Sequence, residues 1–196
     1  QTAAATGFQV VMCDIKDEFV QKGLANIGKS LDRFVKKETL TEDRKTDILG
    51  RIKTTTNLED LQDCFLVVEA ATENFEVKKQ IFQKLDEITS EECILASNTS
   101  SISITKIAAV TSRPDKVIGM HFMNPVPLMK LVEVIRGIAT SDETYQKVHQ
   151  LSEKMGKTPL DCQDYPGFVA NRILLPMINE AIYALYEGVA TRESID

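Results

Sequence analysis

The sequence predicts an α/β protein: a doubly wound, mostly parallel, Rossmann-like sheet, followed by the first helix of an all-α C-terminal domain. The first observation is that short apolar runs alternate with amphipathic helical segments throughout residues 1–163. The second is that these runs are continuous rather than alternating, which is typical of parallel strands buried on both faces. The third is that segment 168–188, after Pro166-Gly167, is apolar and strongly helical, unlike anything before it.

The elements follow in order along the chain. Residues 1–6 form an Ala-rich helix that stops at Gly7, and residues 8–13 are expected to form a short buried strand ending at Asp14. Further strands are expected at the apolar runs 64–68, 93–96, 116–120, 131–135 and 159–162. Helices are expected at the amphipathic or capped segments 17–37, 41–52, 74–85, 104–110 and 141–156, with a short β-branched stretch at 54–56.

We place a domain boundary near Asp164, which divides the chain into residues 1–163 and residues 164–196. The chain opens on Gln1 rather than Met, inside a helix-to-strand step, so we expect it to be part of a longer protein.

Composition excludes several classes of protein. The 196 residues are 43% hydrophobic and 27% charged, an ordinary globular balance that can bury a core. The net charge of −6, without basic runs, argues against nucleic acid or an anionic membrane as the main partner. No apolar run approaches the roughly 20 residues of a membrane span. Four scattered cysteines favour a reduced intracellular protein over a disulfide framework or a metal site, so we expect a cytoplasmic protein without metal.

Asp14 suggests a dinucleotide site. A carboxylate at the end of this first strand would accept hydrogen bonds from adenosine ribose hydroxyls, and it would repel a 2′-phosphate, which favours NAD over NADP. The alternative is a strand-end Asp that caps the next turn or helix. A glycine-rich pyrophosphate loop would decide between the two, and it would precede Gln1.

His121 and Glu133 suggest proton transfer. His121 ends one apolar run, and Glu133 interrupts another, where an ionised carboxylate needs a cation or hydrogen-bond donors. If the segment between the two strands brings these two side chains together, His121 and Glu133 form a dyad suited to exchanging a proton with a substrate hydroxyl. The alternative is that Glu133 faces solvent on an edge strand, and in either case Lys130 or Arg136 could pair with it.

The remaining candidates each have a structural alternative. The hydroxyls of residues 97–101 lie where a strand enters a helix, a usual place for ligand contacts, but Ser and Thr are also ordinary helix caps. Glu73, Asn74 and Lys78 occupy the corresponding place after the previous strand and could equally be solvated charges and polar groups at a helix start. Asn171 could face an interdomain cleft or cap a helix. His149 is interpreted as a partly exposed helix residue.

Taken together, these residues resemble the 3-hydroxyacyl-CoA dehydrogenases, most closely the short-substrate 3-hydroxybutyryl-CoA dehydrogenases. The similarity extends over essentially all 196 residues. The resemblance rests on four segments, which are ASNTSS at 96–101, HFMNP at 121–125, MKLVEVIRG at 129–137 and PGFVANR at 166–172.

The resemblance implies NAD-linked interconversion of an L-3-hydroxyacyl-CoA and a 3-oxoacyl-CoA. It implies that His121 is the general base in oxidation and the acid in reduction, oriented by Glu133, with Ser100 and Asn171 hydrogen-bonding around the reacting oxygen. The matched cofactor-contacting positions are Asp14, Ala70, Glu73, Lys78, Ser100 and Asn124. Ser30 and Lys37, on the long helix after Asp14, match positions that contact coenzyme A in relatives.

The sequence departs from the family in two places. The first strand with its glycine-rich loop is absent, and so is most of the helical C-terminal domain that closes over the acyl chain and builds the dimer. We therefore expect a homodimer through the C-terminal domain in a full-length protein, and no activity from the 196 residues alone. A mitochondrial or peroxisomal compartment stays open.

Three rival interpretations remain. One is a dehydrogenase module of a multifunctional fatty-acid oxidation protein. Another is a non-catalytic, crystallin-like relative, which loss of His121 or Glu133 would have favoured, yet both are present. The third is a dehydrogenase for a different hydroxy acid, which commonly uses a Lys for proton transfer and fits the His-Asn-Pro cluster poorly.

Overall fold

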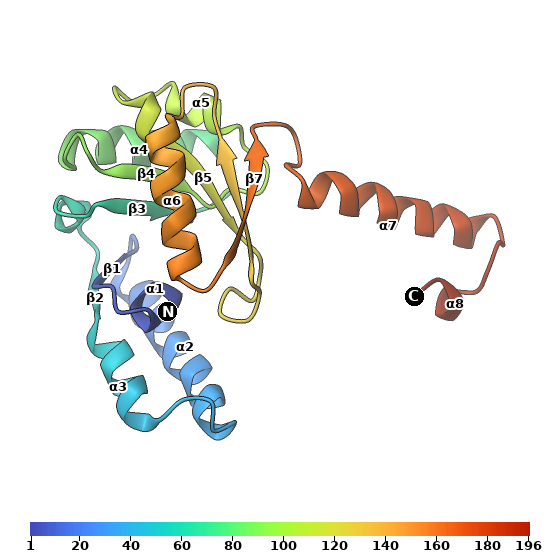
Figure 1. The fold of residues 1–196 in the computed structure, drawn as a ribbon, viewed down its shortest axis with the longest axis horizontal. Helices are drawn as coiled ribbons and strands as arrows, with labels where there is room; N and C mark the ends of the chain where they lie inside the picture. The colour runs from blue at the N-terminus through green and yellow to red at the C-terminus, as the bar shows by residue number, and fades with distance from the viewer.

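The computed structural model describes all 196 residues and contains two sheets (Figure 1). The smaller sheet pairs β1 (Val10–Cys13) with β2 (Ile52–Thr55) in parallel. The larger sheet has the order β3-β4-β5-β6-β7. Its strands are β3 (Leu66–Glu69), β4 (Ile94–Ser97), β5 (Val117–Phe122), β6 (Leu131–Arg136) and β7 (Thr158–Gln163). Only the β5–β6 pair is antiparallel, so the mostly parallel α/β prediction is confirmed.

Helices lie between most consecutive strands, though not between β5 and β6, and they cover both faces of the larger sheet (Figure 1). They are α1 (Thr2–Ala5), α2 (Asp17–Lys36), α3 (Glu42–Gly50), α4 (Phe75–Ile88), α5 (Ile104–Ala108), α6 (Asp142–Lys154), α7 (Ala170–Tyr186) and α8 (Arg192–Ile195). Two short 3-10 helices, 58–61 and 114–116, were not predicted. Side chains of Thr41, Asn74 and Ser141 cap α3, α4 and α6 by accepting backbone N–H groups of the first turn. None of the helices combines the length and apolar character that a membrane crossing requires.

The core lies on the two faces of β4, β5 and β6. One cluster joins Leu95 to Phe82 of α4 and Ile107 of α5, while the other joins Met120 to Val148 of α6. These three central strands are almost wholly buried. Because α4, α5 and α6 fix the sheet from both sides, side chains at the strand ends have a rigid base.

Three predictions about strands and helices need correction. The run 64–68 was expected to be buried on both faces, but β3 is half-buried and Val68 is 38% exposed, because β3 is the end strand of its sheet. The run 8–13 is likewise half-buried as β1, which pairs only with β2. The helix expected to reach residue 52 ends at Gly50, and β-branched Ile52 starts β2 instead.

Helix α7 extends away from both sheets (Figure 1). None of its residues is buried, and large apolar side chains lie exposed along it. The chain turns into α7 through Gly167 and Phe168, which both have positive φ angles, of 81° and 50°. Phe168 itself is buried in the core of the larger sheet, so the entry to α7 is anchored although the helix is not.

Candidate active site

His121 and Glu133 face each other across the antiparallel strands β5 and β6. They are register partners, and His121 Nδ1 lies 2.7 Å from Glu133 Oε2. Both are buried, with exposed fractions of 7% for His121 and 0% for Glu133. An ionised carboxylate only accepts hydrogen bonds, so Nδ1 carries the proton and Nε2 of the neutral ring is left as an acceptor. The two side chains therefore meet as expected, and the alternative in which Glu133 faces solvent is wrong.

Glu133 also binds the start of α7. Its Oε1 accepts the backbone N–H of Val169 at 2.9 Å and that of Ala170 at 2.8 Å. Burial by itself would raise the pKa of Glu133, but the hydrogen bonds from His121, Ala170 and Val169 outweigh it and hold this pKa below its usual range. The carboxylate is therefore ionised at neutral pH. It connects the imidazole of His121 to the first residues of α7.

Neither cation that was considered for Glu133 is its partner. Arg136 pairs with Asp142 instead, at 2.6 Å, and Lys130 makes no ion pair. Glu133 is thus met by the imidazole of His121 and by two backbone N–H groups rather than by a basic side chain. His149 lies half-buried on α6 beside Glu153, which confirms its interpretation as a partly exposed helix residue.

Ser100 places a hydroxyl beside the free nitrogen of His121. Ser100 Oγ lies 3.1 Å from His121 Nε2. Glu73 holds the turn that carries Ser100, because its Oε1 accepts the N–H of Ser100 at 2.6 Å and its Oε2 accepts the hydroxyl of Thr99 at 2.7 Å. Glu73 is exposed, yet both of its oxygens bind the turn after β4. Ser100, His121 and Glu133 thus form one hydrogen-bonded row.

Lys78 is not a solvated charge, so that alternative is wrong. The side chain is 1% exposed, and Nζ donates to the two oxygens of Glu69 at 2.8 and 2.9 Å. Glu69, itself 5% exposed, also accepts the hydroxyl of Ser97 at 2.7 Å. Glu69 was not among the residues predicted from the sequence. The available signal was a carboxylate at the end of an apolar run, the same kind of signal that drew attention to Glu133.

Three predicted cofactor contacts lie just beyond strand ends. Asp14 directly follows β1 and is exposed, with Oδ1 accepting the N–H of Ile15 at 2.7 Å. Ala70 directly follows β3, and Asn124 follows β5 by two residues, and both are exposed. Asn74, considered beside them, is the cap of α4. In doubly wound sheets ligands bind outside the carboxyl ends of the strands, which is where these residues lie.

Asn171, Ser30 and Lys37 form no hydrogen bond with the dyad. Asn171 is half-buried on α7 and directly follows Ala170, but its side chain forms no hydrogen bond. Ser30 is half-buried on α2, and Lys37 is exposed at the end of that helix. Helix α2 packs against α3 and β2, whereas His121 lies in the larger sheet. Their assignments therefore rest on the resemblance alone.

Asp164, at the predicted domain boundary, binds the start of α5. It accepts the hydroxyl of Ser103 at 2.6 Å and the backbone N–H groups of Ile104 and Thr105 at 3.0 and 2.8 Å. Burial would raise the pKa of Asp164, but these hydrogen bonds hold it below its usual range. No sequence pattern pointed to this contact, because residues 103 and 164 are joined only by the fold.

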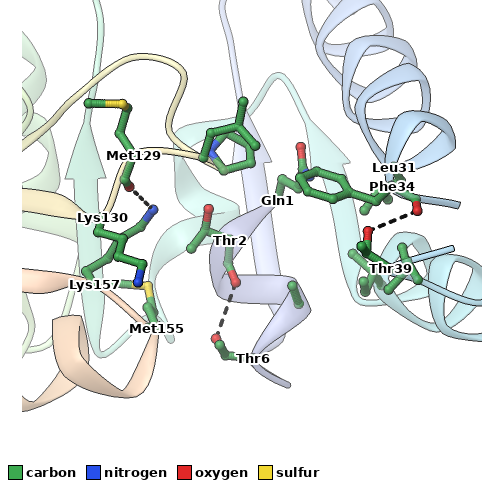
Figure 2. A pocket seen from close by; sticks show the side chains of 16 residues that line it. Gln1, Thr2, Thr6, Leu31, Phe34, Thr39, Met129, Lys130, Met155 and Lys157 are labelled. Carbon is green, nitrogen blue, oxygen red and sulfur yellow. Dashed lines mark hydrogen bonds between the residues drawn. The ribbon is translucent and has the colours of Figure 1, made fainter. Parts of the chain in front are cut away.

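A cavity of about 320 Å³ lies away from the dyad, between α1, α2 and the segments around residues 129 and 157 (Figure 2). Lys157 lies at its wall and donates to the carbonyl oxygen of Met129 at 2.7 Å, and also to that of Val126. Burial lowers the pKa of Lys157. None of the predicted site residues lines this cavity, so it is not part of the row around His121.

Comparisons with known proteins agree with this geometry. The family model for the 3-hydroxyacyl-CoA dehydrogenase NAD binding domain matches residues 1–165, and the model for the C-terminal domain of 3-hydroxyacyl-CoA dehydrogenase matches residues 167–196. A probable 3-hydroxybutyryl-CoA dehydrogenase from Deinococcus radiodurans is 57% identical over the whole chain and 70% of its own length. A 3-hydroxybutyryl-CoA dehydrogenase from Bradyrhizobium diazoefficiens is 53% identical over 99% of the chain and 66% of its own length. The crystal structure of (S)-3-hydroxybutyryl-CoA dehydrogenase from Ralstonia eutropha has a TM-score of 0.96 and 56% identity, covering 100% of this chain and 69% of that one.

Proposed function

This chain belongs to the 3-hydroxyacyl-CoA dehydrogenase family, and from that premise we propose that it interconverts 3-hydroxybutyryl-CoA and acetoacetyl-CoA. NAD-linked oxidoreduction of a 3-hydroxyacyl-CoA follows from the family. The four-carbon substrate is supported by the names of the relatives that are 50–57% identical. The observation that carries the mechanism is the row of Glu133, His121 and Ser100, joined at 2.7 and 3.1 Å.

His121 transfers the proton in this proposal. In oxidation Nε2 accepts the proton of the substrate 3-hydroxyl, and in reduction the imidazolium gives it back to the 3-keto oxygen. Glu133 keeps the proton of the neutral ring on Nδ1 and stabilises the imidazolium when it forms. Because Glu133 is fully buried, this charge pairing is screened little by water.

Ser100 and Asn171 orient the substrate in this proposal. The hydroxyl of Ser100 already lies within hydrogen-bond distance of His121 Nε2, so an oxygen bound at the same nitrogen also lies within reach of Ser100. Asn171 is two residues beyond Val169, whose N–H binds Glu133, and it provides an amide on the side of α7. The two residues act on the reacting oxygen without exchanging its proton.

The residues at the strand ends fit NAD. Asp14 directly follows β1 and is exposed, and one of its carboxylate oxygens has no hydrogen-bond donor within the protein. This oxygen is available to accept hydrogen bonds from the hydroxyls of a ribose. The same negative charge repels a 2′-phosphate. We assign Ala70, Glu73, Lys78, Ser100 and Asn124 to the cofactor as well. When NAD is bound, its nicotinamide accepts or provides the hydride, and the chain provides the proton transfer.

Coenzyme A and assembly complete the proposal. We assign Ser30 and Lys37 on α2 to coenzyme A.

We place the domain boundary between Gln163, where β7 ends, and Asp164. The exposed apolar side chains of α7 support a homodimer formed through the C-terminal region, which begins at Asp164. A sedimentation measurement that finds only monomer in the intact protein, expressed from its complete reading frame, would contradict the dimer.

The decisive experiment is a substrate comparison with the intact protein. We expect NADH to be oxidised with acetoacetyl-CoA faster than with longer 3-oxoacyl-CoA substrates, and NADPH to be used poorly because of Asp14. Preference for longer acyl chains would overturn the four-carbon substrate. Preference for NADPH would overturn the assignment of Asp14.

A further inference from the structure

Two turns carry three of the residues that we assign to cofactor and substrate. Ala70 and Glu73 lie in the turn after β3, and Ser100 lies in the turn after β4. The last residues of the two strands, Glu69 and Ser97, are register partners in the parallel pair. A side chain at this position can therefore reach both turns.

Glu69 binds both turns with one buried carboxylate. Its Oε1 accepts the N–H of Ala71 at 2.6 Å, which holds the first turn. Its Oε2 accepts the hydroxyl of Ser97 at 2.7 Å, and Ser97 Oγ in turn accepts the N–H of Thr99 at 3.3 Å, which holds the second turn. Lys78 donates to both carboxylate oxygens from the inside of α4.

Stability alone does not explain why a buried ion pair lies at this place. Two charges taken out of water cost several kcal/mol each, and apolar side chains of similar size are often as stabilising as the pair. A carboxylate, unlike an apolar side chain, can accept hydrogen bonds from two directions at once. Here the two directions are the two turns of the site.

The second turn carries Ser100, whose hydroxyl lies beside His121. Glu73, in the first turn, accepts hydrogen bonds from the hydroxyl of Thr99 and the N–H of Ser100, in the second. Ser100 Oγ then lies 3.1 Å from His121 Nε2. The spacing of the two turns thus determines where the hydroxyl of Ser100 sits beside His121.

We propose that Glu69 is a positioning residue of this enzyme, which fixes the two turns relative to each other and so holds Ser100 beside His121. Lys78 neutralises the buried carboxylate, and Ser97 extends its reach to the second turn. The inference rests on the proposed function, in which Ser100 orients the reacting oxygen. Glu69 acts through other residues and touches neither cofactor nor substrate.

Replacing Glu69 by glutamine tests the proposal. The three partners of Glu69, which are Ala71, Lys78 and Ser97, are all donors. Glutamine has one oxygen and one NH₂ group, so it accepts a hydrogen bond from only one of the two turns and places its NH₂ against the ammonium of Lys78. We expect kcat to fall by about 30- to 100-fold, because displacing a group of the active site by about 1 Å lowers the rate by about 100-fold. The KM for acetoacetyl-CoA should change less than about threefold, because the coenzyme A contacts lie on α2.

Two further variants separate positioning from folding. Asp86→Asn breaks another ion pair, between half-buried Asp86 at the far end of α4 and buried Arg113 at 2.7 Å, and Asp86 contacts no site residue. Asp86→Asn and Glu69→Gln should both lower the melting temperature, but only Glu69→Gln should lower kcat. Ser97→Ala keeps the Glu69–Lys78 ion pair and removes only the link from Glu69 to the second turn, so it should lower kcat with little loss of thermal stability. If Ser97→Ala keeps the kcat of wild type, Glu69 only neutralises Lys78 and the proposal is wrong.

A crystal structure of the Glu69→Gln variant, or of Ser97→Ala if Glu69→Gln does not fold, tests the proposal without activity. We expect Ser100 Oγ and His121 Nε2 to separate beyond about 4 Å, outside hydrogen-bond distance. An unchanged distance would overturn the positioning role. A wild-type protein that does not oxidise NADH with acetoacetyl-CoA would overturn the proposed function instead, and the crystal structure would still decide the role of Glu69.

Discussion

Replacing Glu133 by glutamine perturbs the proposed proton transfer while keeping the size of the side chain. The carboxylate accepts three hydrogen bonds, from His121 Nδ1 at 2.7 Å and from the N–H groups of Val169 and Ala170 at 2.9 and 2.8 Å. Glutamine has a single oxygen. If that oxygen keeps the two backbone groups, its NH₂ points at Nδ1 and forces the ring proton onto Nε2, the nitrogen that must accept the substrate proton.

The expected losses follow from these contacts. In catalytic triads an amide in place of the carboxylate imposes the wrong histidine tautomer and costs about 10⁴ in kcat. We expect a fall of about 10³- to 10⁴-fold in 3-hydroxybutyryl-CoA oxidation. Hydrogen bonds to a charged group contribute about 1 kcal/mol more than neutral ones, so three of them predict a loss of about 3 kcal/mol in the free energy of unfolding.

Stopped-flow absorbance of NADH formation measures the first loss, and urea unfolding measures the second. Both measurements use the intact protein, with the surface variant Glu91→Gln as a control, since Glu91 is exposed and its side chain forms no ion pair or hydrogen bond. A kcat for Glu133→Gln within about threefold of wild type would refute the reasoning from the tautomer.

The remaining predictions concern the base, the cofactor and acid stability. His121→Ala should abolish turnover and leave the Kd for NADH within about threefold in a fluorescence titration, since no cofactor contact is assigned to this side chain; a large loss of NADH binding would contradict that separation. Asp14→Ser should weaken NADH binding and improve the kcat/KM ratio of NADPH to NADH, because it removes the charge that repels a 2′-phosphate; an unchanged ratio would speak against Asp14. The folded-state pKa values of Glu133 and Asp164 lie below their ordinary values of 4.5 and 3.8, so their stabilisation is present above those values and is lost as the pH falls through the lower folded ones. Melting temperatures should therefore fall less steeply below about pH 4.5 in Glu133→Gln and Asp164→Asn than in wild type, and parallel curves would contradict this.

The sequence predicted the central part of the site because the signal there was local. Glu133 interrupts an apolar run, and His121 ends another one, so each looked out of place in its own strand. The antiparallel pairing then makes them register partners. The apolar pattern did not exclude a solvent-facing Glu133, because alternation along a strand does not show which face of the strand contacts water. In the structure β6 lies between β5 and β7, and the N–H groups of Val169 and Ala170 bind the carboxylate of Glu133.

Other features depend on contacts between distant residues. Lys78 looked like an ordinary charge at a helix start, and its burial depends on Glu69, nine residues earlier at the end of β3. Asp164 reaches α5 across about 60 residues of sequence. The run 64–68 was apolar enough for a central strand, yet it forms the end strand β3, since apolar composition does not determine position in a sheet.

The central reaction proposed for this chain is NAD-linked reduction of a 3-oxoacyl-CoA with the proton from His121. The most direct test follows NADH absorbance after the intact protein is mixed with acetoacetyl-CoA, in wild type and in His121→Ala, at saturating NADH. We predict that wild type consumes one NADH for each 3-hydroxybutyryl-CoA formed, and that the variant consumes NADH at least about 10³ times more slowly. Equal rates in the two proteins, or no NADH consumption by wild type, would contradict the account.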